Sequence, residues 1–140
     1  RDQAAALGLL EPGAEVAEFV GRVDDPQLVA ALQAADVSIS VPASDATSVA
    51  LLESLACGCA VVVSDLPANR AWVDDAGGLR VPAGDAVALA DALHALWLDR
   101  DRTAAMGAHN RGIALARASR RVQMDRMWRL YLRLLGRDDG

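Results

Sequence analysis

Short apolar runs alternate with longer segments of helical period along most of the chain, which is typical of a parallel sheet covered by helices. The most uniform run, Ala60–Val63, is expected to be a strand covered on both faces. We therefore expect an α/β fold: a Rossmann-like, three-layer parallel sheet with helices on both faces, built as a single domain over residues 1–140 and ending in two helices. The predicted strands are residues 16–20, 37–41, 60–63 and 79–81.

The segments between these runs carry the signals of helices. Pro26 stands where a first helical turn tolerates proline, and Asp85 is a predicted helix cap. Residues 48–57 are apolar on nearly every side, which predicts a helix buried against the sheet and ended by Gly58 in a left-handed conformation. Helices are expected over residues 2–9, from Pro26, over 48–57 and 69–73, from Asp85, and over 102–117 and 119–135.

The last predicted helix is amphipathic. Arg126, Arg129 and Arg133 lie on the side opposite an apolar stripe. We expect the stripe to be packed and the arginine side to be solvated. The alternative is a peripheral association of the complete protein with a membrane surface. The stripe consists of Met124, Met127, Trp128, Tyr131 and Leu135.

Composition and charge narrow the classes of function. The formal net charge of -5 would repel a nucleic-acid backbone, so no nucleic-acid partner is expected. Cys57 and Cys59 are too close in sequence for an unstrained disulfide, which favours a reducing, cytoplasmic compartment. No metal site is expected, because no further cysteine occurs and His94 and His109 fall in separate predicted helices.

The segment from Val41 to Gly58 carries the chemistry that the sequence offers. It is a strand end, then a loop of small residues, then the predicted buried helix. Ligands of open α/β sheets bind at this edge, and a helix N-terminus there offers unpaired amides and partial positive charge to a phosphate. The amides belong to Ala46, Thr47, Ser48 and Val49.

Two carboxylates flank these amides. Glu53 stands in an otherwise apolar helix, where an unpaired carboxylate costs several kcal/mol, and it leans back toward the ligand end. A vicinal diol would satisfy it, so a ribose is its natural partner, and Asp45 would face a second hydroxylated group. The alternative is structural: Asp45, Ser44 or Thr47 caps the helix, and Glu53 pairs with Arg70. The residues alone leave both interpretations open.

Several sequence blocks, in order along the chain, resemble the C-terminal donor-binding domain of retaining glycosyltransferases of family 4, which have the GT-B fold. The resemblance runs from Leu7 to the last helix. The blocks are F-V-G-R-V at 19–23, A-A-D-V-S-I-S-V-P at 34–42, L-L-E-S-L-A-C-G-C-A-V-V-V-S-D at 51–65 and G-G-L-R-V-P-A-G-D at 77–85.

In that family two acids separated by seven residues contact the donor sugar and the nucleotide ribose. Asp45 and Glu53 have this spacing, so the resemblance implies that Glu53 binds the ribose and that Asp45 takes the catalytic position at the sugar. Asp45 is one methylene shorter than the family's glutamate. The resemblance also implies diphosphate contacts from the amides of residues 46–49 and base contacts from Gly21 and Val23.

The implied activity is a metal-independent transfer of a sugar from a nucleoside-diphosphate sugar, with retention of configuration and without a cofactor. The acceptor, a glycan, lipid or small molecule, would be bound by an N-terminal domain. Because Arg1 opens the sequence, we expect a fragment that lacks this domain and the first strands of the donor domain, and that is inactive alone.

Alternatives to a transferase stay open. One is a non-catalytic α/β module that binds nucleotide or regulates, and another is a related sugar-nucleotide enzyme such as an epimerase or phosphorylase. The absence of lysine counts against a receiver-like domain and against a phosphorylase. Arg70 stands where the family has a glycine-bearing loop near the donor. We interpret it as a surface arginine rather than as a phosphate contact.

Overall fold

The computed structural model describes residues 17–137, so the helix predicted over residues 2–9 lies outside the described residues. Three strands form one parallel sheet in the order β1-β2-β3, with Val37 opposite Ala60 and Val61 opposite Gly78. The elements are α2 (Asp25–Ala34), β1 (Val37–Ser40), α3 (Val49–Cys57), β2 (Ala60–Ser64), α4 (Pro67–Arg70), β3 (Gly78–Val81), α5 (Ala86–Leu98), α6 (Arg100–Arg117) and α7 (Arg120–Leu134).

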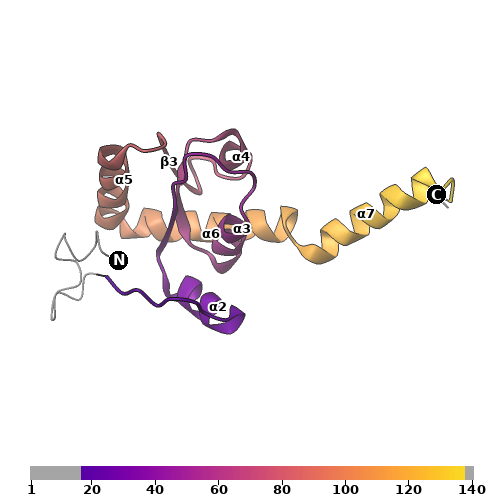
Figure 1. Ribbon diagram of the computed structural model, residues 1–140, viewed down its shortest axis with the longest axis horizontal. Helices are drawn as coiled ribbons and strands as arrows, with labels where there is room; N and C mark the ends of the chain where they lie inside the picture. The colour runs from indigo at the N-terminus through magenta and orange to yellow at the C-terminus, as the bar shows by residue number, and fades with distance from the viewer. Residues whose placement is uncertain (1–16, 138–140) are drawn as a thin grey trace.

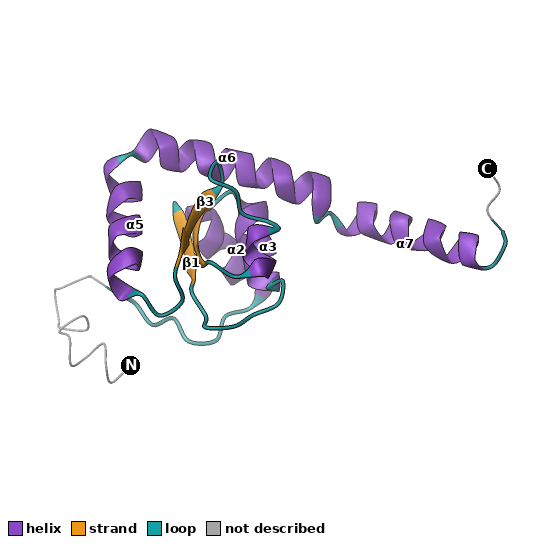
Figure 2. Ribbon diagram, turned by 90° about the horizontal axis from the view of Figure 1, so that it is seen from above, coloured by secondary structure: helices purple, strands orange, loops and turns teal. Residues whose placement is uncertain are grey.

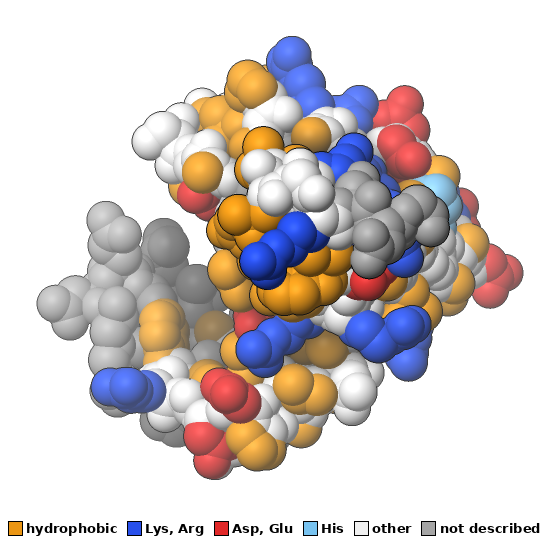
Figure 3. All heavy atoms as spheres, turned by 90° about the vertical axis from the view of Figure 1, so that its right-hand side faces the viewer, with side chains coloured by type: hydrophobic (Ala, Val, Ile, Leu, Met, Phe, Trp, Pro, Cys, Tyr) orange, Lys and Arg blue, Asp and Glu red, His pale blue; other side chains and the backbone are white. Residues whose placement is uncertain are grey.

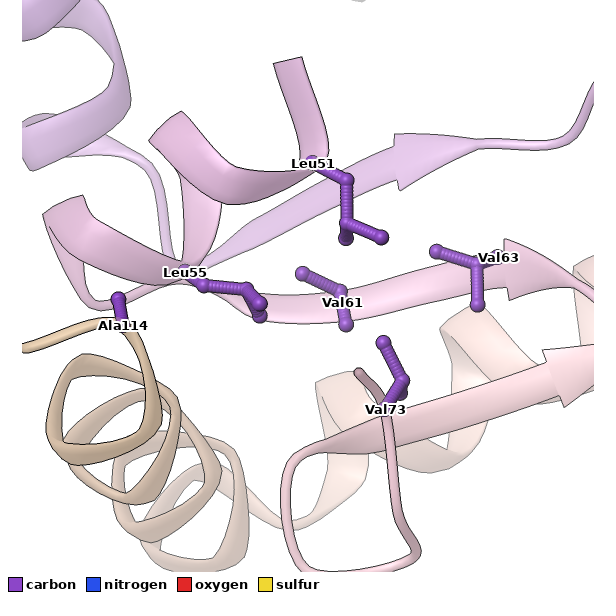
Figure 4. Packing of buried hydrophobic residues seen from close by; sticks show 6 residues of the cluster. All are labelled: Leu51, Leu55, Val61, Val63, Val73 and Ala114. Atoms are coloured by element: carbon purple, nitrogen blue, oxygen red, sulfur yellow. The ribbon is translucent and has the colours of Figure 1, made fainter. Parts of the chain in front are cut away.

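Helices cover both faces of the sheet, as expected (Figure 2). Every residue of β2 is buried. Because successive side chains of a strand point to opposite faces, Val61 and Val63 pack toward α3 and the C-terminal part of α6, whereas Ala60 and Val62 pack toward α5. Figure 4 shows Leu51 and Leu55 of α3 on the first of these faces. The uniform β-branched run was therefore correctly predicted to be a central strand.

Helix α3 ends where its sequence predicts. Gly58 adopts a left-handed conformation, with φ of 87°, and its N–H donates to the last turn of the helix. Immediately beyond, α6 crosses at close range, because a Cβ added at Gly107 would lie 2.0 Å from the carbonyl oxygen of Gly58. A glycine at position 107 thus sets how closely α6 approaches the end of α3.

A buried amide joins α6 to the sheet. Asn110 is 1% exposed, and its Nδ2 donates to the carbonyl oxygens of Cys59, at 2.8 Å, and of Gly77, at 2.7 Å. These carbonyls precede β2 and β3, so one side chain ties the starts of two strands to one helix. Sequence reasoning did not single out this residue.

The strand predicted over residues 16–20 is wrong for its described part. Residues 17–20 are irregular and exposed. A strand needs a neighbour to complete its hydrogen bonds, and in the described sheet β1 pairs only with β2. The chain instead leads into α2, whose first turn is closed by a capping box between Asp24 and Gln27.

The prediction that the apolar stripe of the last helix is packed is also wrong for the described chain. Helix α7 extends away from the sheet and its covering helices (Figures 1 and 2), and none of its residues is buried. Within residues 17–137 it approaches mainly the end of α6, so nothing covers the stripe. Seen from the far end of α7, hydrophobic side chains lie beside arginines on the surface (Figure 3). Trp128, for example, is 62% exposed.

Element boundaries otherwise differ by a few residues from those predicted. Helix α4 begins at Pro67 rather than at residue 69, and α6 begins at Arg100 because Asp99 caps it. Asp85 caps α5, as predicted.

Candidate functional site

The segment between β1 and α3, residues 41–48, lies at the carboxyl end of the parallel sheet and is named here the β1–α3 loop. Side chains hold it at both ends. At its start, the Ser64 hydroxyl donates to the carbonyl oxygen of Pro42 at 2.6 Å. At its end, the Ser48 hydroxyl accepts from the N–H of Leu51 at 3.4 Å and so caps α3. Residues 43–47 between these anchors are exposed.

The predicted phosphate-binding amides lie together at this loop end and on the first residue of α3. Within the described chain, the N–H groups of Ala46, Thr47, Ser48 and Val49 donate to no protein acceptor. Unpaired amides at a helix N-terminus carry partial positive charge and suit an anionic group. The structure therefore brings these four predicted residues into one exposed turn.

The Asp45 carboxylate is exposed and forms no hydrogen bond or ion pair with any other residue in the range 17–137. The alternative in which Asp45, Ser44 or Thr47 caps α3 is wrong, because Ser48 is the N-cap. Asp45 is thus open to a ligand at the middle of the loop.

Glu53 is exposed, so the expectation that its carboxylate is buried in an apolar helix is wrong, although the helix itself packs against the sheet as predicted. The buried residues of α3 are Leu51, Ser54 and Leu55, and the helix packs against α6, α2 and the sheet. Because the Glu53 carboxylate is not buried, the cost of burying an unpaired charge gives no reason to expect a ligand at Glu53. Nevertheless, Glu53 has no hydrogen-bond or ion-pair partner in the described chain.

Glu53 borders an apolar groove of about 380 Å³ between α3 and the junction of α6 with α7. The carboxylate is the one charged group among the lining side chains. The remaining lining residues are Val49, Leu52, Ala56, Ala114, Leu115, Ala118 and Ser119.

Arg70 does not pair with Glu53. Its guanidinium binds both carboxylate oxygens of Asp65, from Nε at 2.7 Å and from Nη2 at 2.8 Å. Arg80 also approaches Asp65, at 3.8 Å. The hydrogen bond from Arg70 is the main cause that holds the pKa of Asp65 below its ordinary value, and both arginines add to it by their charge. Arg70 is thus an exposed arginine in an ion pair, as the sequence interpretation had it.

Gly21 and Val23 lie on the irregular segment before α2, with Gly21 in the left-handed region at φ of 68°. In the described chain neither shares a hydrogen bond or ion pair with the β1–α3 loop. The structure does not join them to the other site residues, and their contact with a base stays a prediction.

Within residues 17–137, the structure shows neither a metal-binding cluster nor a membrane-spanning helix. No three His, Cys, Asp or Glu side chains come close enough there to hold a metal ion. No helix in that range combines the length and apolar character needed to cross a membrane. Cys57 and Cys59 are free thiols, and burial raises the pKa of Cys59.

Sequence reasoning missed two buried polar residues behind the loop. Ser64 is fully buried, and Asn69 is 4% exposed and donates from Nδ2 to the carbonyl oxygen of Ser64 at 2.8 Å. The available signal was a serine that ends an otherwise apolar, β-branched strand.

Comparison with known families identifies the chain's relatives. The sequence model of the family described as glycosyl transferases group 1 matches residues 2–99, which include the β1–α3 loop and Glu53. The chain belongs to this family. The match agrees with the resemblance that the sequence blocks carry.

Two relatives show how the chain compares with longer proteins. The chain is 43% identical over 95 residues to the phosphatidyl-myo-inositol mannosyltransferase of Mycobacterium leprae (strain TN), over 64% of this chain and 25% of that protein. It is 36% identical over 106 residues to the protein of the same name from Mycolicibacterium smegmatis (strain ATCC 700084 / mc(2)155), over 74% of this chain and 25% of that protein. The chain thus spans about a quarter of their length.

Two solved structures share the fold of this glycosyl transferase group 1 chain. Sucrose-phosphate synthase (tll1590) from Thermosynechococcus elongatus superposes with a TM-score of 0.81 at 24% identity, over 96% of this chain and 35% of that one. Anabaena Alr3699/HepE, solved in complex with UDP, superposes with a TM-score of 0.71 at 24% identity, over 83% and 31% respectively. At this identity the likeness establishes the arrangement of sheet and helices.

Proposed function

We propose that this chain is the donor-binding part of a glycosyltransferase, which binds a nucleoside-diphosphate sugar for transfer of its glycosyl group to an acceptor hydroxyl. The observation that carries the proposal is the β1–α3 loop. It presents four free amides and, with α3, two unpartnered carboxylates at the ligand-binding edge of a parallel sheet. Membership of the glycosyl transferases group 1 family supports the same function.

Each part of the site suits a different part of the donor. The amides of residues 46–49 would hold the diphosphate, because they are free donors at a helix N-terminus. Glu53 would accept hydrogen bonds from the ribose hydroxyls, because a carboxylate repels phosphate but binds a diol. Asp45 would face the sugar from the exposed middle of the loop.

The transfer that we propose is metal-independent and retains the configuration of the sugar, as the family resemblance implies. The protein would mainly position the donor and stabilise the departing diphosphate. Arg70 is held in an ion pair with Asp65. The family resemblance implies a basic residue elsewhere in the complete donor domain that neutralises the leaving diphosphate, so we expect this chain alone to bind nucleotide without turnover.

The relatives suggest a first donor and acceptor to test. Both are named phosphatidyl-myo-inositol mannosyltransferases, which favours a mannosyl group and a lipid acceptor for the complete protein. The free thiols of Cys57 and Cys59 are consistent with the cytoplasmic location that we propose.

Nucleotide binding tests the proposal. The melting temperature of the complete protein is followed in titrations with UDP, GDP and ADP, for the wild type, Glu53→Gln and the control Asp91→Asn. Asp91 is an exposed acid on α5, away from the loop. We expect one diphosphate to raise the melting temperature steadily with its concentration, with a dissociation constant about tenfold or more higher in Glu53→Gln and unchanged in Asp91→Asn.

Two outcomes would contradict the assignment. If none of the three nucleotides stabilises the wild type, the donor site is wrong. If Glu53→Gln binds as well as Asp91→Asn, the ribose contact is wrong. Binding without sugar transfer by the complete protein would instead favour the non-catalytic nucleotide-binding module.

A further inference from the structure

A chain of buried hydrogen bonds runs behind the proposed donor site. Asn69 of α4 donates to the carbonyl oxygen of Ser64 at 2.8 Å, and the hydroxyl of Ser64 donates to the carbonyl oxygen of Pro42 at 2.6 Å. Ser64 is the last residue of β2 and Pro42 is the second residue of the β1–α3 loop. The three residues therefore link α4 and the end of β2 to the start of the loop.

We propose that Ser64 is a positioning residue for the β1–α3 loop: it determines where Asp45 stands, and Asn69 holds Ser64 in place. This inference rests on the proposed function, because it concerns the sugar end of the same site. Proline has no N–H, so its carbonyl is the one main-chain group through which Pro42 can form a hydrogen bond. That carbonyl's partner in the described chain is Ser64.

The position of Asp45 in the loop makes this anchor important. Asp45 is three residues from Pro42 and three from Ser48, the two points where side chains hold the loop. Its own carboxylate has no protein partner, so its location depends on these anchors. If the start of the loop were released, Asp45 would move more freely while the end of the loop stayed fixed.

The nucleotide end of the site depends less on Ser64 than Asp45 does, because the amides of residues 46–49 lie at or next to the end of the loop that Ser48 holds. The amide of Val49 and the Glu53 side chain belong to α3, which Ser48 caps and which packs through Leu51 and Leu55. Loss of the Ser64 hydroxyl should therefore impair the handling of the sugar far more than the binding of the nucleoside diphosphate. A merely structural hydrogen bond would not produce that difference.

Thr103 provides a matched control. It is 3% exposed, and its hydroxyl donates to the carbonyl oxygens of Leu96, at 2.8 Å, and Asp99, at 2.9 Å, where α5 meets α6. Thr103→Val removes a buried hydroxyl bonded to main-chain carbonyls without touching the loop. It therefore controls for a general loss of stability.

The test compares the wild-type complete protein with Ser64→Ala, Ser64→Thr and Thr103→Val. Backbone ¹⁵N order parameters of residues 43–47 report the motion of the loop directly. The affinities for GDP and UDP report the nucleotide end of the site, and the rates of hydrolysis of GDP-mannose and UDP-glucose report the sugar end. In hydrolysis the bond between the anomeric carbon and the β-phosphate oxygen breaks, and water supplies the new hydroxyl.

We expect Ser64→Ala to lower the order parameters of the loop and to lower kcat by about tenfold to a hundredfold, with diphosphate affinity changed less than about twofold. The loop of Ser64→Thr, which keeps the hydroxyl, should be more ordered than that of Ser64→Ala. Thr103→Val should show wild-type order parameters in the loop and wild-type kcat even if its melting temperature falls.

Unchanged order parameters of the loop in Ser64→Ala, or equal losses of kcat in Ser64→Ala and Thr103→Val, would overturn the inference. A wild-type protein that binds neither GDP nor UDP would overturn the proposed function and the sugar-end role with it. The order parameters would still decide whether Ser64 holds the loop.

Discussion

Asn110 provides a quantitative test of how α6 is joined to the sheet. In Asn110→Ala, the carbonyl oxygen of Cys59 loses its buried donor, whereas that of Gly77 keeps the N–H of Val61 at 3.4 Å. An unsatisfied carbonyl costs about 1–3 kcal/mol. The Oδ1 of Asn110 is itself buried without a partner in the described chain, so its removal returns part of this cost. We expect a net loss of about 1–4 kcal/mol in the free energy of unfolding.

Gly77 supplies the matched second mutation. A Cβ at this position would lie 2.1 Å from Oδ1 of Asn110, so Gly77→Ala forces the amide to move in the wild type. In the Asn110→Ala background that clash is absent. The two mutations should therefore cost less together than the sum of their separate effects, by at least about 1 kcal/mol.

Urea denaturation followed by circular dichroism measures all four proteins of this cycle. Arg111→Ala, an exposed neighbour on the same helix, should stay within about 0.5 kcal/mol of the wild type. If Asn110→Ala were as stable as Arg111→Ala, or if the two mutations were additive, the described contact would not stabilise the protein.

Three further predictions concern the site and the surface. In the complete protein, Asp45→Asn should lower the rate of sugar transfer by about a hundredfold and change nucleotide affinity by less than about threefold. Asp45→Glu should retain activity. Equal losses of kcat and nucleotide affinity in Asp45→Asn would contradict a role of Asp45 at the sugar. The pKa of Asp65 is lowered from its ordinary 3.8, so the ionised carboxylate stabilises the fold above pH 3.8, and this stabilisation is lost as the pH falls through the lowered pKa. Arg70→Leu should raise the pKa of Asp65 in an NMR titration, and an unchanged titration would refute the ion pair. If α7 lies on anionic membranes, the protein should sediment with phosphatidylglycerol vesicles but not with phosphatidylcholine vesicles, and Trp128→Glu should abolish sedimentation; equal sedimentation of the variant would exclude this face.

Local signals in the sequence were sufficient for much of the fold. The run Ala60–Val63 predicted a central strand, and Gly58 and Asp85 marked the ends of helices, because strand covering and helix capping depend mainly on neighbouring residues. The β1–α3 loop was likewise predicted from a strand end followed by a helix start. Its four amides are free in the described chain.

The errors concern features that depend on distant partners. The exposure of Glu53 depends on which face of an apolar helix the sheet and α6 cover, and the sequence of that helix does not indicate this. Residues 17–20 have the composition of a strand but no neighbouring strand in the described sheet. Ser64 and Asn110 bond to residues 22 and 51 positions away, so their partners could not be read from neighbouring residues, although the serine that ends an apolar strand marked Ser64 as unusual.

The location of the bound nucleotide tests the central claim most directly. Amide chemical shifts of the ¹⁵N-labelled protein, recorded during titration with GDP and with UDP, show which residues a diphosphate approaches. The donor site described above predicts the largest saturable shifts at Ala46, Thr47, Ser48 and Val49, with a further shift at Glu53. Saturable shifts confined to another surface, with these five amides unchanged, would contradict it.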